Sequence, residues 1–184
     1  GCQPNPGHFA LAELARLLPG TMLVTQNVDG LHQRAGSRYI LELHGSLSRV
    51  RCFDFCETFD DWDDSHSGET IPPRCGKCGA MLRPDIVWFG EQLPEKELHE
   101  AFHAAERCRV MLVAGTSGLV QPAASLPWTA RRSGARVVEV NPQPSEVSAT
   151  ADIVLRGQSG EVLPRLVERV KELLEDPIAM LLDI

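Results

Sequence analysis

Four cysteines in the middle of the chain have the spacing of a metal site. Cys52 and Cys56 form one pair, and Cys75 and Cys78 form a second pair after 18 intervening residues. Two short knuckles of this kind offer four thiolates to one tetrahedral zinc ion, and four thiolates leave no open position for water. The spacing therefore predicts a structural zinc site of the zinc-ribbon type. A redox role for the second pair alone would leave the first pair unexplained.

Three small, polar segments follow predicted strands and could bind a nucleotide. They are residues 26–30 (Gln-Asn-Val-Asp-Gly), 115–118 (Gly-Thr-Ser-Gly) and 141–142 (Asn-Pro). Ligands of parallel sheets bind beyond the carboxyl ends of the strands, so we expect these segments to meet at one edge of a sheet. Each segment alone is also typical of a plain turn. Together they would form a polar crevice that suits riboses and phosphates better than a cation.

His44 is the candidate acid/base residue among the six histidines. It follows a predicted strand at residues 39–43 and precedes Gly45, which leaves room for a ligand. An imidazole in this position can exchange a proton near neutral pH, although position alone leaves a structural role equally open. His99 and His103 could pair on a metal, but no third ligand is near them and we expect a solvated helix face. The other three are expected to be structural or exposed: His8, His32 and His66.

Alternating helices and strands must position these groups. Apolar spacing predicts helices at residues 7–18, 95–107, 122–132 and 161–174, and strands at 21–25, 39–43, 109–114, 136–140 and 152–155. This alternation is typical of the α/β class, in which helices cover both faces of a Rossmann-like parallel sheet. Residues 52–79 interrupt the pattern. They carry the four clustered cysteines and no apolar periodicity, so we expect a small zinc-ribbon insert without a hydrophobic core of its own.

The composition narrows the class of protein further. A chain of 184 residues with 43% hydrophobic residues can form one domain with a real core, which excludes disordered and fibrous classes. The net charge of −7 argues against nucleic acid as a direct partner. Apolar runs such as residues 110–114 are much shorter than the roughly 20 residues of a membrane span. We expect no membrane partner, no signal peptide, a cytoplasmic location, and free thiols at Cys2 and Cys108.

Several motifs together resemble the sirtuin family of NAD-dependent protein deacylases. In the family's order they are residues 25–32 (Thr-Gln-Asn-Val-Asp-Gly-Leu-His), 42–46 (Glu-Leu-His-Gly-Ser), the two cysteine pairs, 83–91 (Arg-Pro-Asp-Ile-Val-Trp-Phe-Gly-Glu), 115–117 (Gly-Thr-Ser) and 140–142 (Val-Asn-Pro). The resemblance extends from about residue 4 to residue 170. The Trp-Phe-Gly-Glu form is most similar to the bacterial and mitochondrial branch that includes desuccinylases.

The resemblance implies two domains with a cleft between them. The large Rossmann-like domain would consist of residues 1–51 and 80–184, and the small zinc domain of residues 52–79. NAD and zinc are the implied cofactors, and acyl-lysine proteins are the implied substrates. The implied reaction removes an acetyl, succinyl or related group from lysine. In it, the acyl oxygen attacks the nicotinamide ribose, nicotinamide leaves, and O-acyl-ADP-ribose is released.

The resemblance also assigns site residues one by one. His44 matches the general base that activates a ribose hydroxyl, and the four cysteines of the two pairs match the zinc ligands. The matches to NAD contacts are Gln26, Asn27, Val28, Asp29, Gly115, Thr116, Ser117, Asn141, Pro142, Gln143 and Ser159. The matches to the substrate strip are Val87, Phe89, Gly90 and Glu91. The backbone of this strip would pair with the substrate peptide as an added strand.

The sequence departs from the family pattern in two ways. The first cysteine pair is separated by three residues where the family usually has two, which is still within the range of zinc knuckles. The family's first strand and its Gly-Ala-Gly-x-Ser phosphate loop, which precede the matched region, are not found in the printed sequence. We therefore expect residues 1–184 alone to bind NAD very weakly and not to deacylate peptides, and expect an upstream extension to restore both.

Two other functions stay open at the level of sequence. One is an inert module that binds NAD or ADP-ribose and keeps a structural zinc. The other is the related nucleotide-binding domain found within larger cofactor enzymes, which would not need the four cysteines or the Glu-Leu-His-Gly motif. His44, Asn27 and Asp29 together favour the enzyme, whereas the absence of the phosphate loop motif favours the inert module for these residues.

Overall fold

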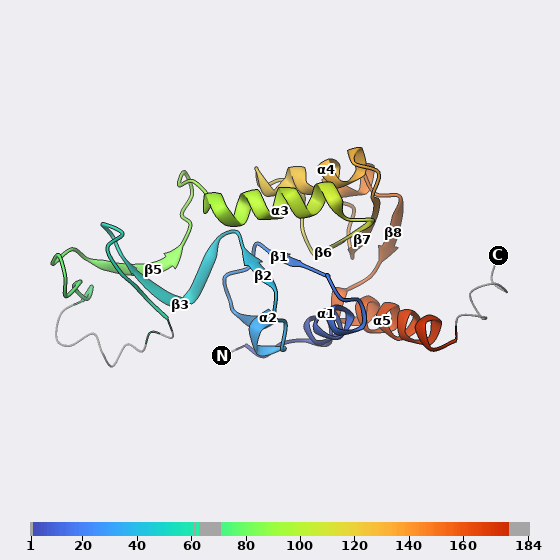
Figure 1. Ribbon diagram of the computed structural model, residues 1–184, viewed down its shortest axis with the longest axis horizontal. Helices are drawn as coiled ribbons and strands as arrows, with labels where there is room; N and C mark the ends of the chain where they lie inside the picture. The colour runs from blue at the N-terminus through green and yellow to red at the C-terminus, as the bar shows by residue number, and fades with distance from the viewer. Residues whose placement is uncertain (1, 61, 63–70, 177–184) are drawn as a thin grey trace.

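The computed structural model describes residues 2–60, 62 and 71–176. They form an α/β body and a smaller β lobe, which extends from the body along the long axis of the molecule (Figure 1). We call the smaller part the cysteine lobe and define it as the described residues between 45 and 86. No helix among the described residues is long and apolar enough to cross a membrane.

The body contains all five α-helices of the described residues, which match the four predicted helices and add one short turn. Their bounds are α1 Pro6–Leu17, α2 Leu31–Arg34, α3 Glu95–Arg107, α4 Leu126–Arg132 and α5 Ser159–Glu175. Asn5 caps α1, because its side chain accepts from the backbone N–H groups of Gly7 and His8. Two 3₁₀ turns lie at Ala123–Ser125 and Glu146–Ala149, and the first of them forms the start of the helix predicted from residue 122.

The strands of the body are all parallel, as the alternation of helices and strands predicts. They are β1 Leu23–Thr25, β2 Ile40–Glu42, β6 Val110–Ala114, β7 Arg136–Asn141 and β8 Ile153–Arg156. Strands β1 and β2 pair in one sheet, and β6, β7 and β8 pair in that order in another. The predicted α/β class is therefore confirmed, with the parallel strands of the described residues in two sheets.

Helices cover both faces of these strands (Figure 1). Helices α3 and α4 bury Ala101, Ala105 and Ala130 against Leu43 and the strand residue Met111. On the opposite face, α1 and α5 pack on β7 and β8 through a second apolar cluster. Its members include Ala10, Val140, Leu155, Leu163 and Val167. The alanines let the helices approach closely, and the strand ends between the two layers remain free to carry polar groups.

The cysteine lobe is an antiparallel sheet that extends beyond the predicted insert on both sides. Its strands are β3 Gly45–Cys52, β4 Thr58–Phe59 and β5 Leu82–Ile86, in the order β4-β3-β5. A register shift between Ser46 and Val50 interrupts the alternation of buried and exposed residues in β3, which hides the strand from sequence periodicity. We expected no apolar core here, but Val50 and Leu82 pack with Phe59 and Trp62 beside two of the cysteines.

Candidate active site and metal centre

The three polar segments that follow strands meet around Thr116. The Nε2 atom of Gln26, after β1, donates to Thr116 Oγ1 at 3.5 Å. The Nδ2 atom of Asn141, at the end of β7, donates to the Thr116 backbone oxygen at 2.8 Å. These two bonds join segments that are 90 and 25 residues apart in the chain. The expected meeting of the segments at the strand ends is therefore present in the structure.

Ser159, the first residue of α5, lies next to the same edge. Gly115 has a positive φ of 66°, and a Cβ atom built on it would lie 3.6 Å from Ser159 Oγ. A glycine here keeps the backbone open beside the helix N-terminus, where N–H groups favour an anion. The α1 backbone also approaches α5 closely, since a Cβ atom on Gly7 would lie 2.9 Å from the Ser159 backbone oxygen.

The other residues matched to NAD contacts surround this edge. Asn27, Ser117, Pro142 and Gln143 are exposed, and no hydrogen bond from their side chains is seen in the described part of the chain. Val28 and Asp29 have local structural roles in addition. The Val28 backbone oxygen accepts from Leu47 N at 2.8 Å, and Asp29 Oδ1 accepts from Leu31 N at the start of α2 at 3.0 Å.

His44 is half-buried between β2 and β3, and its ring is held by a backbone group. Nδ1 lies 2.9 Å from the backbone oxygen of Gln26. A carbonyl oxygen can only accept, so Nδ1 carries the hydrogen and the neutral ring leaves the lone pair on Nε2. The next residue, Gly45, has a φ of 79°, and a Cβ atom on it would lie 2.0 Å from the Asp85 backbone oxygen. His44 is thus a potential proton acceptor whose backbone lies directly against β5.

Residues 87–91, which follow β5, lie beside His44. The backbone N of Val87 donates to the His44 backbone oxygen at 3.0 Å. Trp88, Phe89 and Gly90 are exposed, and Phe89 is completely open to solvent. Hydrogen bonds from Arg83 and from the Trp88 backbone N–H lower the pKa of Glu91 to about 2. The Glu91 carboxylate is therefore used within the chain, and the exposed backbone of this strip is the part that a peptide could contact.

An arginine bridge connects the body to the cysteine lobe near this strip. Arg49 in β3 donates to Glu42 Oε2 at 2.6 Å and to Asp85 Oδ2 at 2.9 Å. Glu42 ends β2, and its other oxygen accepts from Gln33 Nε2 of α2 at 2.5 Å. The sequence motifs contain Glu42 and Asp85 without indicating this role, because no local spacing marks a contact between separate sheets.

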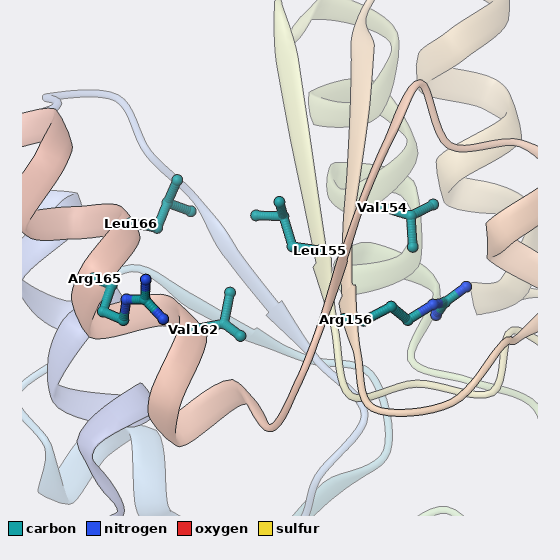
Figure 2. A pocket seen from close by; sticks show the side chains of 6 residues that line it. All are labelled: Val154, Leu155, Arg156, Val162, Arg165 and Leu166. Atoms are coloured by element: carbon teal, nitrogen blue, oxygen red, sulfur yellow. The ribbon is translucent and has the colours of Figure 1, made fainter.

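Two cavities are present beside these elements. A cavity of about 520 Å³ separates α2 from the cysteine lobe and has a polar lining that includes the predicted site residue Asp29. Its lining residues are Asp29, Gly30, Gln33, Arg34, Ser46, Ser48, Arg49 and Asp60. The other, of about 370 Å³, lies between β8 and α5 and has none of the predicted site residues in its lining (Figure 2). The first cavity is therefore the one that adjoins the candidate site.

The four clustered cysteines lie together in the cysteine lobe. Their Sγ atoms are all within 4.8 Å of one another, with Cys52 and Cys78 at 3.4 Å and Cys56 and Cys75 at 3.3 Å. Four sulfurs bound to one zinc at about 2.3 Å would be roughly 3.8 Å apart, so the set fits a tetrahedral ion. Backbone N–H groups of Cys78 and Lys77 lower the pKa of Cys75 to about 7, which favours its thiolate. The four cysteines thus cluster in the arrangement that the predicted zinc site needs.

The remaining histidines and cysteines agree with the structural roles expected for them. His99 and His103 are exposed on α3, and in the described part of the chain only the four cysteines form a possible metal cluster. His8 Nδ1 accepts from the Asn5 backbone at 3.2 Å, and the His8 ring contacts the His32 ring. Cys2 and Cys108 are free thiols, and Cys108 lies at the end of α3. His66 lies outside the described residues.

The chain is similar to known proteins over most of its length. The family model described as "Sir2 family" matches residues 1–122. NAD-dependent protein deacylase 2 of Pyrobaculum aerophilum is 52% identical over 169 residues, which cover 92% of this chain and 67% of that protein. The crystal structure of a Sir2 homolog–NAD complex has a TM-score of 0.86 and 48% identity, covering 94% of this chain and 66% of that one. Sir2Af2 bound to a myristoylated histone peptide has a TM-score of 0.83 and 43% identity, covering 96% and 75%.

Proposed function

The chain belongs to the Sir2 family, and from that premise we propose that it removes acyl groups from protein lysines in an NAD-dependent reaction. One observation carries the proposal. His44 presents Nε2 as a proton acceptor at the point where the nucleotide-side segment and the peptide-side strip meet, because its Nδ1 contacts Gln26 and its backbone oxygen contacts Val87. A base between these two surfaces is what an acyl transfer from lysine to a nucleotide ribose requires.

The nucleotide side of the site fits the adenosine and ribose parts of NAD. Thr116, Asn141 and Ser159 offer hydroxyl, amide and backbone groups at one edge, and Gly115 keeps that edge open. When bound, NAD supplies the ribose carbon that accepts the acyl oxygen. His44 would accept a proton at Nε2 from a hydroxyl of that ribose, and the Gln26 carbonyl would stabilise the imidazolium through its bond to Nδ1.

The substrate side fits an extended acyl-lysine peptide. Residues 88–90 are exposed directly after a strand, so their backbone can pair with a peptide as an added strand. We propose that the strip is formed by Val87, Phe89, Gly90 and Glu91. The Glu91 side chain holds the strip in its conformation through its bonds to Arg83 and to the Trp88 backbone N–H. Acetyl and succinyl groups are both candidates for the acyl group. The net charge of −7 supports a protein partner in preference to nucleic acid.

We also propose that the chain has two domains, one that binds NAD and one that binds zinc. Residues 1–51 and 80–184 would form the NAD-binding domain, and the zinc-binding domain would be centred on residues 52–79 and share strands β3 and β5 with it. The six cysteines, all within the described residues, form no disulfide, which supports a reducing, cytoplasmic location. The zinc ion would hold the lobe and take no part in the chemistry, because four thiolates complete its coordination.

The test is nicotinamide release from NAD in the presence of acetyl-, succinyl- and longer acyl-lysine peptides. It should be run with residues 1–184 and with a version that carries the family's phosphate loop upstream. We expect release that depends on the acylated peptide in the extended version. If the extended version binds ADP-ribose but releases no nicotinamide with any peptide, the protein is an inert binding module instead.

A further inference from the structure

Arg83 lies beneath the exposed strip of residues 87–91 and makes two hydrogen bonds and one stacking contact with it. Nη1 donates to Glu91 Oε1 at 2.5 Å, and Nη2 donates to Glu91 Oε2 at 3.1 Å. Nη2 also donates to the Ile86 backbone oxygen at 2.8 Å. The guanidinium carbon lies 3.4 Å from the centre of the Trp88 ring. Only 7% of Arg83 is exposed, whereas the Glu91 side chain is 34% and Trp88 47% exposed, so the strip covers the guanidinium in a bidentate, stacked contact.

Glu91 connects Arg83 to the backbone of the strip, because its carboxylate binds both the guanidinium and a backbone N–H group. Its Oε2 atom accepts from Trp88 N at 2.9 Å, and the Trp88 backbone oxygen accepts from Glu91 N at 2.9 Å. The turn between them contains Gly90 with a φ of 89°. Trp88 and Glu91 are thus tied to each other twice, and Phe89 is held at the outer end of the turn with its side chain in solvent.

The other end of the strip is attached to the candidate base. Val87 N donates to the His44 backbone oxygen, and Gly45 pairs with Ile86 across the β3–β5 ladder. The strip is therefore fixed at its start by the backbone of His44. At its end it is fixed through the side chain of Glu91 on Arg83.

Arg51 is the second cation near Glu91, and its contact is weaker. Its Nη2 atom lies 3.7 Å from Glu91 Oε2, beyond hydrogen-bond distance, and its Nε atom lies 3.3 Å from Asp85 Oδ1. Its guanidinium stacks on Phe55 in the cysteine lobe. Arg51 thus adds positive charge near Glu91, whereas Arg83 makes the directional bonds.

We propose that Arg83 is a positioning residue for the acyl-lysine peptide: its bonds to Glu91 and its stacking on Trp88 keep residues 88–90 in the turn that receives the peptide backbone. This inference rests on the proposed deacylase function. Arg83 itself is covered by the strip and does not face the peptide. It acts through the shape of the strip and leaves the nucleotide side unaffected.

The test compares Arg83→Met, Arg83→Lys and Glu91→Gln, with Arg136→Met as the matched control. Arg136 has a 77% exposed side chain and lies on β7, away from the strip. We expect Arg83→Met to raise the KM for the acylated peptide at least tenfold while the KM for NAD and the zinc content stay unchanged. Arg83→Lys should give an intermediate KM, because a single ammonium cannot reproduce the fork and the stacking. Arg136→Met should match the unaltered protein.

A second readout does not depend on activity. In Arg83→Met, hydrogen exchange at the Trp88 and Glu91 amides should become faster, whereas exchange at Val87, which bonds to His44, should change less. If Arg83→Met is too unstable to measure, Glu91→Gln and Arg83→Lys carry the same comparison. Unchanged amide exchange and an unchanged peptide KM in any folded variant would overturn the role of Arg83. Absence of deacylation in the unaltered protein would overturn the proposed function, while the exchange result would still decide whether Arg83 holds the strip.

Discussion

The Nδ1 atom of His44 lies 2.9 Å from the backbone oxygen of Gln26. This single contact orients the ring, fixes its hydrogen on Nδ1 and leaves Nε2 to accept a proton. The side chain of Gln26 also donates to Thr116 at 3.5 Å. Gln26 therefore contacts both the proposed base and the proposed nucleotide edge, so one segment joins the two.

Replacing His44 with alanine should abolish most of the activity and leave the fold intact. A positioned general base contributes about 10² or more to the rate, so we expect deacylation to fall at least 100-fold. The side chain is half-buried at a strand end, and the melting temperature should change little. Activity and thermal melting are measured together, with His99→Ala as the control because His99 is exposed on α3. Near-normal turnover would remove His44 from the mechanism, and a large drop in melting temperature would favour a structural role.

Removing the zinc should loosen the cysteine lobe. Thiolate ligation couples metal binding to folding, so a chelator or Cys56→Ser should lower the metal content well below one zinc per chain. We expect the melting temperature to fall by at least about 5 °C. The control is Cys2→Ser, since Cys2 is exposed and lies outside the cluster. Full zinc content in Cys56→Ser, or a melting curve that is insensitive to metal removal, would contradict this prediction.

Local patterns in the sequence identify the elements that are built from local interactions. Residues 95–107 are predicted as a helix and form α3 with those bounds, because the apolar positions that define its buried face recur with the helical period. The cysteine spacing likewise predicts a ligand set, since the knuckles are short and the chemistry of thiolates is specific. The motif order also leads to His44, whose contacts then specify the tautomer.

Contacts between distant strands could not be predicted in this way. Strand β3 was missed because its register shift breaks the alternation. The small core behind it depends on Phe59 and Trp62, which lie within residues 52–79, where the sequence shows no apolar periodicity. Arg83 stands in a recognisable motif, but its partner Glu91 becomes visible only when the strip folds back over it. Glu139 belongs to the same category, because its partners come from a later loop and from another strand.

Glu139 should stabilise the loop that follows β7. The residue is 1% exposed, and its carboxylate accepts from Ser145 and Ser148 and lies 3.5 Å from Arg156 Nη1. Glu139→Ala would leave the half-buried hydroxyls of Ser145 and Ser148 without this acceptor, which costs about 1–3 kcal/mol of unfolding free energy. Glu139→Gln should cost less because it keeps one acceptor oxygen.

Denaturant unfolding measures this difference, with the exposed Glu146→Ala in the same loop as the control. Equal stability of the Glu139→Ala and Glu146→Ala variants would contradict a stabilising role. ADP-ribose affinity should fall with Glu139→Ala as well, because Asn141 starts the loop that the carboxylate holds.

The bond between Arg83 and Glu91 should make stability depend on pH in the acid range. The ordinary pKa of 4.5 for the Glu91 carboxyl is lowered to about 2, first by the hydrogen bonds from Arg83 and then by the Trp88 N–H. A lowered folded-state pKa means that the stabilisation is fully present above about 4.5 and is lost as the pH falls toward 2.

The measurement is the difference in melting temperature between the unaltered protein and Glu91→Gln as a function of pH. We expect a constant difference at neutral pH that shrinks below about pH 4.5. Taking the difference between two proteins cancels the loss of zinc in acid, which affects both. A difference that stays the same down to the lowest accessible pH would show that the Glu91 charge does not stabilise the strip.

Gly45 should be the glycine whose replacement damages both the fold and the site. Its φ is 79°, and a Cβ atom would lie 2.0 Å from the Asp85 backbone oxygen and 2.9 Å from the Asp85 carbonyl carbon. Both neighbours are backbone atoms, so the clash can be relieved only if β3 and β5 separate. Such a separation would also stretch the bond between the His44 oxygen and Val87 N.

Gly134→Ala is the control for Gly45→Ala. It measures the free-energy cost of an alanine at positive φ without the clash against the Asp85 backbone. Gly134 has a φ of 95° but no atom within 4 Å of a built Cβ, so alanine there costs only the left-handed strain of about 1–2 kcal/mol. We expect Gly45→Ala to lower the unfolding free energy by at least about 2 kcal/mol more than Gly134→Ala does, in the range typical of severe backbone clashes. Gly45→Ala should also raise the peptide KM, because the strip moves with β5, whereas Gly134→Ala should not. Equal losses of stability in the two variants would show that β3 and β5 do not need their close approach at Gly45.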